Sequence, residues 1–537
     1  MTCRFSSAVS LTLALWVTGS LATQTLARQS AVSATAAQGG VESQVDRVFA
    51  KWSETMPGCA VGVATNGKPS LAKGYGMADL EHDVRITPDT IFEAGSVSKQ
   101  FTAAAVLLLA REGKLSLDDP VKKYIPELPE YPASGVVTIR HMLNHTSGLR
   151  DWGSVAAISG WPRTSRVHTH AHVLEIVNHQ HALNFPPGTR WSYSNTGFNL
   201  AAIIVQRVSG MPFPRFTKER IFQPVGMTQT SWRDDYTRVV KGRAVAYRTG
   251  PEGFQADMPF ENVYGNGGLL TTVGDLLKWN ENFTEHKVGD AAFAAEQQTS
   301  GTFNDGRPHG YGLGLFLGTY KGLNEVDHSG STAGYSAFLT RFPDQRLSVA
   351  VLCNVATNAT QLAHAVADVY LGDRVKATAT KPTSIPADAA GLYRSTATGL
   401  ALTVAPEKDA SGGNRTWTFE KDAVRAIDQF GTVEQYVRVA PAKPTPQDLG
   451  AYEGVYASAD AEAELTAVVE GSILVLKQRP DHVFRLTPTY ADAFGAASLG
   501  TVIFRRDNAG HVIELSVVQD RVWDMRFTRT AKVKVKS

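Results

Sequence analysis

Cysteine is scarce in this chain of 537 residues, which contains only Cys3, Cys59 and Cys353. Cys59 and Cys353 each lie in an apolar, strand-like run. Neither has the charged neighbours that lower the pKa of a reactive thiol. We therefore expect Cys59 and Cys353 to be two buried free thiols rather than a disulfide, and we expect no thiol chemistry from them.

An excess of either charge is also lacking. The chain has 53 Lys and Arg against 51 Asp and Glu, a formal net charge of +2, and its one Lys-rich run is Lys532 to Lys536. A nucleic acid or an acidic membrane surface would be bound by a clustered positive field, so neither is expected as a partner. Hydrophobic residues make up 43% of the chain, enough for a sizeable core.

Apolar runs long enough to span a bilayer are missing too. The stretch Ala8 to Gly19 follows Arg4 and is too short for a comfortable span, as in a signal peptide. We predict a signal peptide over residues 1–27. Two small-residue triplets fit a cleavage site, Ser20-Leu21-Ala22 and Thr25-Leu26-Ala27. An uncleaved anchor is the alternative. The expected product is a periplasmic or secreted protein with no stable membrane insertion after cleavage.

Two changes of composition divide the mature chain. Residues 373–388 are rich in Lys, Thr, Ala and Pro and predict a linker, and residues 441–448 predict a second, stiffer one. The division leaves a large region over residues 36–372, a short β module over 389–440 and a second β module over 449–531.

The large region mixes helices with strands. Asn66-Gly67 is a strong turn signal between two strand-like runs and predicts a hairpin. A run that is apolar on every side predicts a buried helix. Strands at both ends of the region, with helices between, predict an α+β fold whose antiparallel sheet has its first and last strands as neighbours. The expected elements are a hairpin over 57–75, a helix over 97–112, and strands over 313–317, 335–342 and 347–353.

The last region alternates apolar and polar residues with a period of two. This pattern predicts an antiparallel sheet or small barrel. Gly391-Leu392-Tyr393 of the short module repeats in Gly454-Val455-Tyr456, so we interpret the short module as a smaller relative of the last one. The alternating apolar sets are Leu465, Ala467 and Val469; Ile513, Leu515 and Val517; and Trp523, Met525 and Phe527.

The spacing Ser96-Val97-Ser98-Lys99 carries the first chemical signal. On a helix, positions three apart share a face, so Lys99 would reach the Ser96 hydroxyl, and burial would lower the pKa of its ammonium so that it can act as a base. Ser70-Leu71-Ala72-Lys73 has the same spacing but lies in the hairpin, where such residues point to opposite faces. The alternative for Ser96 is a simple N-cap serine.

Two more triplets support a catalytic interpretation. Tyr193-Ser194-Asn195 precedes an apolar helical run, and its phenol and amide suit proton relay and substrate binding. Tyr264-Gly265-Asn266 has the same form, but its glycine-rich setting is typical of a tight turn. His328-Ser329-Gly330 begins what we expect to be an edge strand, where the Ser331 N–H would serve as an oxyanion donor.

Ser-x-x-Lys, Tyr-x-Asn and His-x-Gly, in this order, are the three signatures of the serine β-lactamase and penicillin-binding-protein superfamily, which the chain resembles. The likeness covers roughly residues 40–372. It implies a three-layer β-lactamase/transpeptidase-like fold, while the C-terminal part is similar to the lipocalin-like β modules often attached to this branch. Flanking segments similar to the class C β-lactamase, esterase and D-aminopeptidase branch (peptidase family S12) are His141–Leu149, Asn184–Gly188, Gly267–Leu270 and Tyr311–Gly314.

The resemblance implies a role for each motif residue. Ser96 is the nucleophile, Lys99 and Tyr193 share proton transfer, and the substrate is bound by Asn195, His328, Gly330 and Ser331. β-Lactamases of this branch carry lysine where His328 stands, and a histidine is largely neutral at pH 7. We therefore expect a small-molecule or peptide substrate with a peptide, amide or ester bond. The alternatives are a weak β-lactamase and an acyl-trapping sensor without fast turnover.

No metal or other cofactor is expected, because serine, lysine and tyrosine complete this chemistry. Five histidines lie in the stretch from His168 to His181. Thr169 is the predicted N-cap of a helix in this stretch, and that helix would hold the histidines too far apart to bind one ion. The sequence leaves two alternatives for Asp151 and Trp152: they line the pocket, or they belong to an ordinary surface loop. The sequence also leaves open the exact substrate and the oligomeric state.

Overall fold

The fold of the large region is built on one antiparallel sheet. The structure is a computed structural model and describes residues 40–375, 385–405, 415–420 and 422–531, so the predicted signal peptide and part of the first linker lie outside the described residues. Strand β13, late in the region, pairs with β1, the first, as predicted. In sheet order the strands are β10 (Phe316–Tyr320), β11 (Leu323–Thr332), β12 (Tyr335–Phe342), β13 (Leu347–Cys353), β1 (Cys59–Thr65) and β2 (Lys68–Tyr75).

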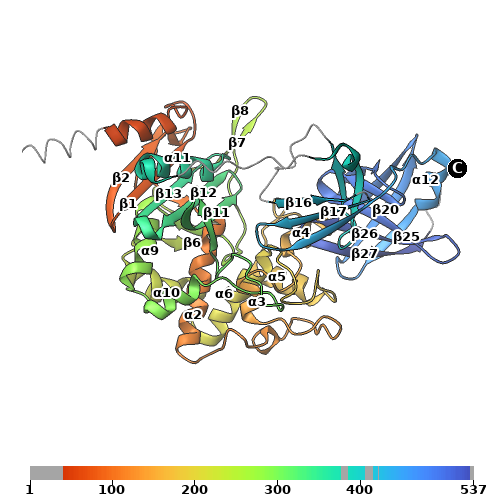
Figure 1. Ribbon diagram of the computed structural model, residues 1–537, viewed down its shortest axis with the longest axis horizontal. Helices are drawn as coiled ribbons and strands as arrows, with labels where there is room; N and C mark the ends of the chain where they lie inside the picture. Colours follow the sequence, from red (N-terminus) through yellow and green to blue (C-terminus); the bar gives the residue numbers. More distant parts are fainter. Residues whose placement is uncertain (1–39, 376–384, 406–414, 421, 532–537) are drawn as a thin grey trace, which may run out of the picture.

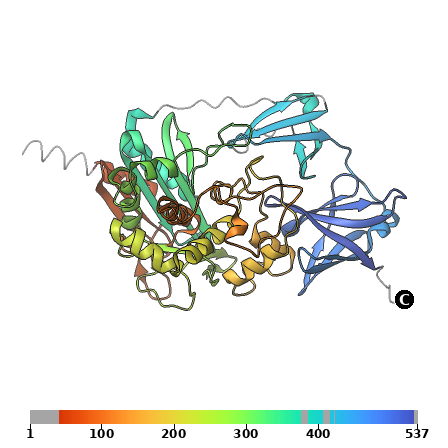
Figure 2. The ribbon, with the colours of Figure 1, turned by 90° about the horizontal axis from the view of Figure 1, so that it is seen from below.

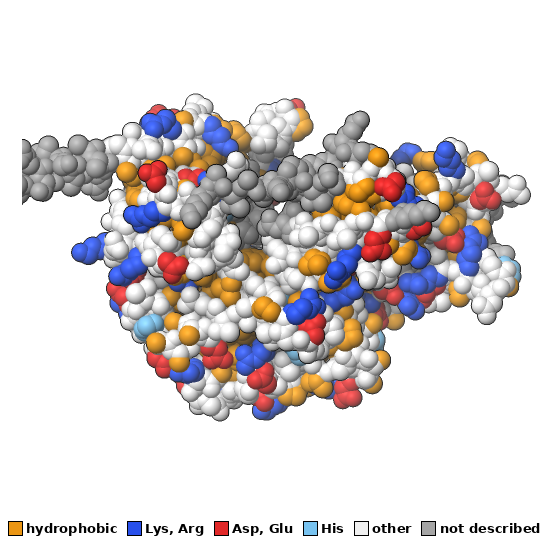
Figure 3. All heavy atoms as spheres, in the orientation of Figure 1, with side chains coloured by type: hydrophobic (Ala, Val, Ile, Leu, Met, Phe, Trp, Pro, Cys, Tyr) orange, Lys and Arg blue, Asp and Glu red, His pale blue; other side chains and the backbone are white. Residues whose placement is uncertain are grey.

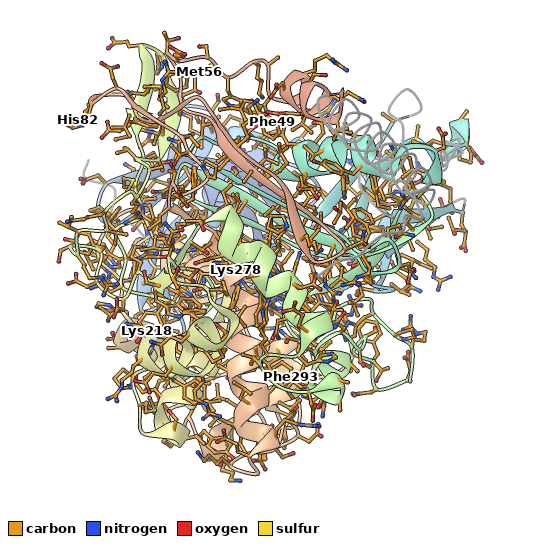
Figure 4. The ribbon with its side chains drawn as sticks, turned by 90° about the vertical axis from the view of Figure 1, so that its left-hand side faces the viewer. Phe49, Met56, His82, Lys218, Lys278 and Phe293 are labelled. Atoms are coloured by element: carbon orange, nitrogen blue, oxygen red, sulfur yellow. A yellow bond between two sulfur atoms is a disulfide. The ribbon has the colours of Figure 1, made fainter. Side chains whose placement is uncertain are left out.

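Alternate residues of the sheet enter two separate cores. Ala60 of β1 faces the larger core, which includes α2 and α9, whereas Val61 and Val63 face a smaller core with α11 and Phe49. Figure 4 shows α9, which carries Lys278, and Phe49 on opposite sides of the strands. The result is the three-layer arrangement of helices, antiparallel sheet and helices that the sequence predicts.

The helices that cover the sheet surround the buried helix α2. Its residues from Lys99 to Leu107 are all buried, and it packs mainly against α6. The principal helices are α2 (Lys99–Arg111), α3 (Ile139–Leu143), α4 (Trp152–Ile158), α5 (His170–Asn178), α6 (Asn195–Ser209), α7 (Phe213–Thr217), α8 (Gln223–Val225), α9 (Val273–Glu285), α10 (Ala291–Gln297) and α11 (Ala359–Leu371).

Short strands complete the large region. They pair as β3 with β4, β7 with β8, and β9 between β5 and β6. Their bounds are β3 (Met77–Asp79), β4 (Val84–Arg85), β5 (Phe92–Glu93), β6 (Ser231–Trp232), β7 (Tyr247–Gly250), β8 (Gly253–Ala256) and β9 (Leu269–Thr271).

The expectation of two free thiols is wrong. Cys59 and Cys353 form a disulfide, with their Cα atoms 4.0 Å apart. The two residues face each other directly in the register of β1 and β13. Each run taken alone looks like a buried apolar strand, so only the pairing of the first and last strands reveals that the two thiols meet.

Three local expectations also need correction. The helix expected over 97–112 begins as a 3-10 turn, Gly95–Ser98, and becomes α-helical at Lys99. The strand expected over 313–317 begins at Phe316, because Leu313 and Leu315 lie in a buried loop. The strand expected to begin at His328 begins at Leu323, and β10 pairs with it up to Asp327; from His328 to Thr332 it has no strand partner on that side among the described strands, which agrees with the expected edge.

The C-terminal part forms two antiparallel β modules, side by side at one end of the molecule (Figures 1 and 2). The half-barrel runs in the order β15 (Ala401–Val404), β14 (Gly391–Ser395), β18 (Val433–Arg438), β17 (Ala423–Asp428) and β16 (Arg415–Phe419). After α12 (Pro446–Leu449), the nearly closed barrel runs in the order β22 (His482–Arg485), β21 (Ile473–Gln478), β20 (Ala463–Glu470), β19 (Gly454–Ser458), β27 (Val522–Ala531), β26 (Val512–Gln519), β25 (Gly500–Arg506), β24 (Ala493–Ala496) and β23 (Thr487–Pro488).

The repeated Gly-x-Tyr segments occupy equivalent places in the two modules. Tyr393 pairs with Arg438 between the first and last strands of the half-barrel, and Tyr456 pairs with Arg529 in the same way in the barrel. Each tyrosine hydroxyl donates to the carbonyl four residues before it, Ala389 at 2.9 Å and Tyr452 at 2.7 Å. These shared contacts support the interpretation of the half-barrel as a smaller relative of the barrel.

Charge is mixed on the face of the molecule that Figure 3 shows. On the face in Figure 3, acidic and basic side chains are interspersed rather than gathered by sign. Within the described residues, no helix has both the length and the apolar character that a membrane span requires.

Candidate active site

Ser96 lies where the sheet meets the start of the buried helix. It sits in the 3-10 turn directly before α2, beside β11. Two glycines permit this close approach: a Cβ at Gly95 would lie 2.6 Å from the Ser331 nitrogen, and a Cβ at Gly330 would lie 2.0 Å from the Ala94 carbonyl oxygen. Gly95 also has a φ of +50°, which favours glycine. Ser96, Gly330 and Ser331 therefore come together at one wall of a pocket.

Lys99 reaches Ser96 from the first turn of α2. Its Nζ donates to Ser96 Oγ at 3.0 Å, to Asn195 Oδ1 at 2.9 Å and to the Asn266 carbonyl oxygen at 2.8 Å. The side chain is fully buried. Burial, and after it the positive charge of Arg521, holds the pKa of the Lys99 ammonium well below its usual range. The lysine is thus placed and tuned to accept a proton from Ser96.

Tyr193 faces the same serine from the loop before α6. Its phenol is hydrogen-bonded to Ser96, and burial raises its pKa while that hydrogen bond opposes the rise. The Lys99 Nζ lies 4.7 Å from the centre of the Tyr193 ring. A protonated phenol in this position can pass a proton between the serine oxygen and a substrate atom.

Asn195 and Asp151 fix the start of α6. The Asn195 side-chain oxygen accepts from Lys99, so its amide nitrogen is the atom that can donate to a substrate carbonyl. The Asn195 backbone N–H donates to Asp151 Oδ2 at 2.8 Å. Asp151 is buried and caps α4 through Ser154, so it positions the asparagine rather than belonging to a surface loop.

His328 is buried on β11 and is neutral. Burial, and then the charge of Lys99, lowers its pKa to about 3. One ring nitrogen, Nδ1, lies 2.6 Å from the Ser329 carbonyl oxygen and must donate to it, so Nε2 accepts from the Tyr311 hydroxyl at 3.0 Å. The histidine therefore presents no positive charge to the pocket.

Asn266 is a site residue that sequence reasoning missed. The glycine-rich turn expected at Tyr264-Gly265-Asn266 is present, with φ of +96° at Gly265. That turn aims the Asn266 carbonyl at Lys99, while its side-chain oxygen accepts from Asn199 Nδ2 at 2.6 Å. A backbone acceptor leaves no side-chain motif, so only the glycines around it could have signalled it.

His145 and Tyr311 were also missed as individual site residues, although each lies in a segment that resembles the family. The His145 ring is 4.3 Å from the Tyr193 ring, and its Nδ1 accepts from the Ser194 N–H at 3.2 Å. Burial and the Lys99 charge keep its pKa well below the usual range, so it too is neutral. His145 thus packs against Tyr193, which is hydrogen-bonded to Ser96, while Tyr311 contacts His145 and His328.

Both β modules reach into the pocket. Its volume is about 700 Å³, and its walls include Phe430 of the half-barrel and Arg521 of the barrel. Phe430 stacks on Trp191 with ring centres 3.7 Å apart, and the Arg521 guanidinium lies 4.8 Å from the centre of the Tyr193 ring. Each residue lies in the turn between the last two strands of its module. No spacing rule links these turns to Ser96.

The histidine-rich stretch forms a helix instead of a cluster. Thr169 caps α5 as predicted. Of the described residues, only Asp79, Glu81 and His82 form a group of three whose ligand atoms lie within 4.8 Å of one another, and that group is largely exposed.

Known proteins resemble this chain over the large region. The sequence model of the Beta-lactamase family matches residues 45–372. The chain belongs to the Beta-lactamase family. Among its relatives, a D-aminopeptidase of Gluconobacter oxydans is 30% identical over 360 residues, covering 66% of this chain and 66% of that protein. Penicillin-binding protein 4* of Bacillus subtilis is 30% identical over 301 residues, covering 52% and 64%.

Solved structures of Beta-lactamase relatives share the fold. An octameric penicillin-binding protein homologue from Pyrococcus abyssi aligns with a TM-score of 0.55 at 23% identity and covers 91% of this chain and 99% of its own. A D-amino acid amidase from Ochrobactrum anthropi aligns with a TM-score of 0.53 at 21% identity, covering 62% and 99%. The chain spans at most about two thirds of the length of the first curated relatives.

Proposed function

We propose that the protein is a serine hydrolase that forms an acyl-enzyme at Ser96 and cleaves a peptide, amide or ester bond, with D-amino-acid derivatives as the preferred substrates. The observation that carries this proposal is the 3.0 Å contact between Lys99 Nζ and Ser96 Oγ at a buried lysine of lowered pKa. Relatives named D-aminopeptidase support the substrate class.

The first half of the reaction transfers the acyl group. Neutral Lys99 takes the proton of the Ser96 hydroxyl as Oγ attacks the substrate carbonyl carbon. The backbone N–H groups of Ser96 and Ser331 bind the oxygen that becomes negative. The proton then passes through Lys99 and Tyr193 to the leaving amine or alcohol, and the bond to that group breaks.

The second half releases the acid. A water molecule gives a proton to the Lys99–Tyr193 pair and attacks the acyl carbon, and Ser96 recovers its proton as the ester bond breaks. The Asn195 side-chain amide nitrogen donates to a carbonyl oxygen in the acyl part of the substrate. Because His328 is neutral, the β11 wall lacks the fixed cation that a lysine would supply to a β-lactam carboxylate.

We also propose that the protein is exported to the periplasm or secreted. The Cys59–Cys353 disulfide supports export, because disulfides persist in oxidising compartments. The apolar stretch after Arg4, which lies outside the described residues, supports it as well. N-terminal sequencing of the protein from a periplasmic or culture fraction tests this: a start near residue 23 or 28 is expected, and an intact Met1 in the cytosolic fraction would contradict it.

Turnover decides between a hydrolase and its alternatives. Purified protein and its Ser96→Ala variant are incubated with D-alanyl p-nitroanilide, p-nitrophenyl butyrate and nitrocefin, and product per enzyme is counted. Many turnovers on the anilide or ester, lost in Ser96→Ala, are expected. A single stoichiometric burst would instead indicate an acyl-trapping sensor, and turnover of nitrocefin far above the other substrates would indicate a β-lactamase.

A further inference from the structure

The tip of the barrel's last hairpin is fastened inside the catalytic region. The Arg521 carbonyl oxygen accepts from Asn184 Nδ2 at 3.0 Å and from the Asp151 N–H at 3.3 Å. The Asn184 side-chain oxygen in turn accepts from the Trp523 N–H at 3.0 Å. One asparagine thus holds the hairpin on both sides of Val522, and Asp151, which positions Asn195, also holds Arg521.

The Arg521 guanidinium projects from this tip into the Ser96 pocket. It lies over the Tyr193 ring and, within the described part of the chain, has no hydrogen bond or ion pair from its side chain. Arg163 lines the same pocket but is paired with Glu261. Glu93, a carboxylate of the pocket wall, is paired with Arg233. Arg521 therefore offers its N–H donors to whatever occupies the pocket.

The position of Arg521 indicates which part of a substrate it meets. It stacks against Tyr193, the group that hands a proton to the leaving group in the proposed reaction. Its charge acts directly on Lys99, since it contributes to the lowered pKa of that side chain. His328 on β11 is neutral and Arg163 is paired with Glu261, so among the described lining residues Arg521 supplies the positive charge that has no acidic partner.

We infer that Arg521 is a specificity-determining residue that selects substrates with a carboxylate on the leaving-group side of the scissile bond. Guanidinium and carboxylate form a bidentate, charge-assisted pair that is about twice as strong as a neutral hydrogen bond. The inference rests on the proposed hydrolase function. It assigns the barrel a direct part in substrate recognition.

Two dipeptides that differ only in this charge provide the test. D-Alanyl-D-alanine carries a leaving-group carboxylate, and D-alanyl-D-alaninamide replaces it with a neutral amide. Release of D-alanine or D-alaninamide is followed by mass spectrometry for the wild type, Arg521→Gln, Arg521→Lys and Arg485→Gln. Arg485 is an exposed arginine of the same barrel, on β22, and its substitution changes the net charge equally.

Arg521→Gln is expected to lower the ratio of kcat/KM for the acid to kcat/KM for the amide at least ~10-fold. Loss of the Arg521 charge also acts on Lys99, but that effect is common to both dipeptides and cancels in the ratio. The ratio for Arg521→Lys should lie between those of the wild type and Arg521→Gln, and the ratio for Arg485→Gln should match that of the wild type. Equal losses on both dipeptides, or an unchanged ratio between them, would overturn the inference.

Binding to Ser96→Ala separates this inference from the proposed function. Calorimetry on Ser96→Ala and on Ser96→Ala/Arg521→Gln measures the affinity for each dipeptide without turnover. Tighter binding of the acid that is lost with Arg521 supports the inference even if the wild type hydrolyses neither dipeptide, an outcome that counts only against hydrolysis of peptide bonds. Equal affinity for acid and amide would overturn the inference even in an active hydrolase.

Discussion

At the scale of single residues, the account depends on a lysine that is neutral when it acts. Lys99 is buried and lies near Arg521, and both features lower its pKa. Its Nζ also donates to three oxygen acceptors. His328, in contrast, titrates near pH 3 and stays neutral throughout the working range. A change of activity with pH near neutrality therefore cannot come from His328.

The pH profile of kcat/KM reports this difference. Activity needs unprotonated Lys99, so kcat/KM is expected to rise with pH through its lowered pKa and to fall as pH drops below it. His328→Gln should keep that rising limb at the same pH, because the limb does not belong to the histidine. A limb that disappears or moves by a full pH unit in His328→Gln would contradict the assignment.

The sequence predicts part of this site well. Residues three apart at a helix start, and a Tyr-x-Asn before a second helix, are local patterns, and the fold brings Ser96, Lys99, Tyr193 and Asn195 together as those patterns imply. Asn266 acts through a carbonyl, and Arg521 arrives from another module across more than 400 residues of chain. Neither contribution follows any local spacing.

At the scale of elements, the decisive contact is that of β11 with the turn that carries Ser96. Gly330→Ala would place a Cβ 2.0 Å from the Ala94 oxygen and 3.0 Å from the Ser96 nitrogen. Since a shift of about 1 Å can cost ~10²-fold in rate, kcat/KM is expected to fall at least ~10-fold. Gly318→Ala on β10, where nothing lies within 4 Å, is the matched control and should leave kcat/KM unchanged. Wild-type kcat/KM in a folded Gly330→Ala protein would refute the contact.

The sequence predicts the pairing of β1 with β13 but not the register that places Cys59 opposite Cys353. The disulfide joins positions 294 residues apart and so restricts the unfolded chain strongly. The double variant Cys59→Ala/Cys353→Ala is expected to lower the free energy of unfolding by ~2–4 kcal/mol, measured by urea denaturation. Reduced wild type should lose a similar amount, and equal stability of oxidised and reduced protein would show that the bond is absent.

At the scale of the whole molecule, each of the two related β modules contributes to the pocket wall through the turn between its last two strands. The β17–β18 turn and the β26–β27 turn, each between the last strands of its module, converge on the pocket from outside the Beta-lactamase match. Period-two alternation predicts the modules, because it reflects one buried face. Their docking depends on loop tips that carry no such period.

The half-barrel is expected to shape the pocket through Phe430. Phe430→Ala removes the ring stacked on Trp191 and should lower kcat/KM about 2–10-fold, since such aromatic pairs are worth ~0.5–1.5 kcal/mol. The effect should lie mainly in KM, because Phe430 does not touch Ser96 or Lys99. Phe254→Ala, at an exposed ring on β8, is the control and should change nothing. An unchanged KM in Phe430→Ala would show that the half-barrel does not shape the substrate pocket through this ring.

The central claim is that Ser96 carries the acyl group, and peptide mapping by mass spectrometry tests it most directly. The protein is quenched in acid within milliseconds to seconds of mixing with a D-alanyl ester, digested and mapped. A mass increase of one alanyl group on the peptide with Ser96, absent in Ser96→Ala, is the predicted result. Substrate turnover with no adduct at any quench time, or an adduct that persists in Ser96→Ala, would contradict the account.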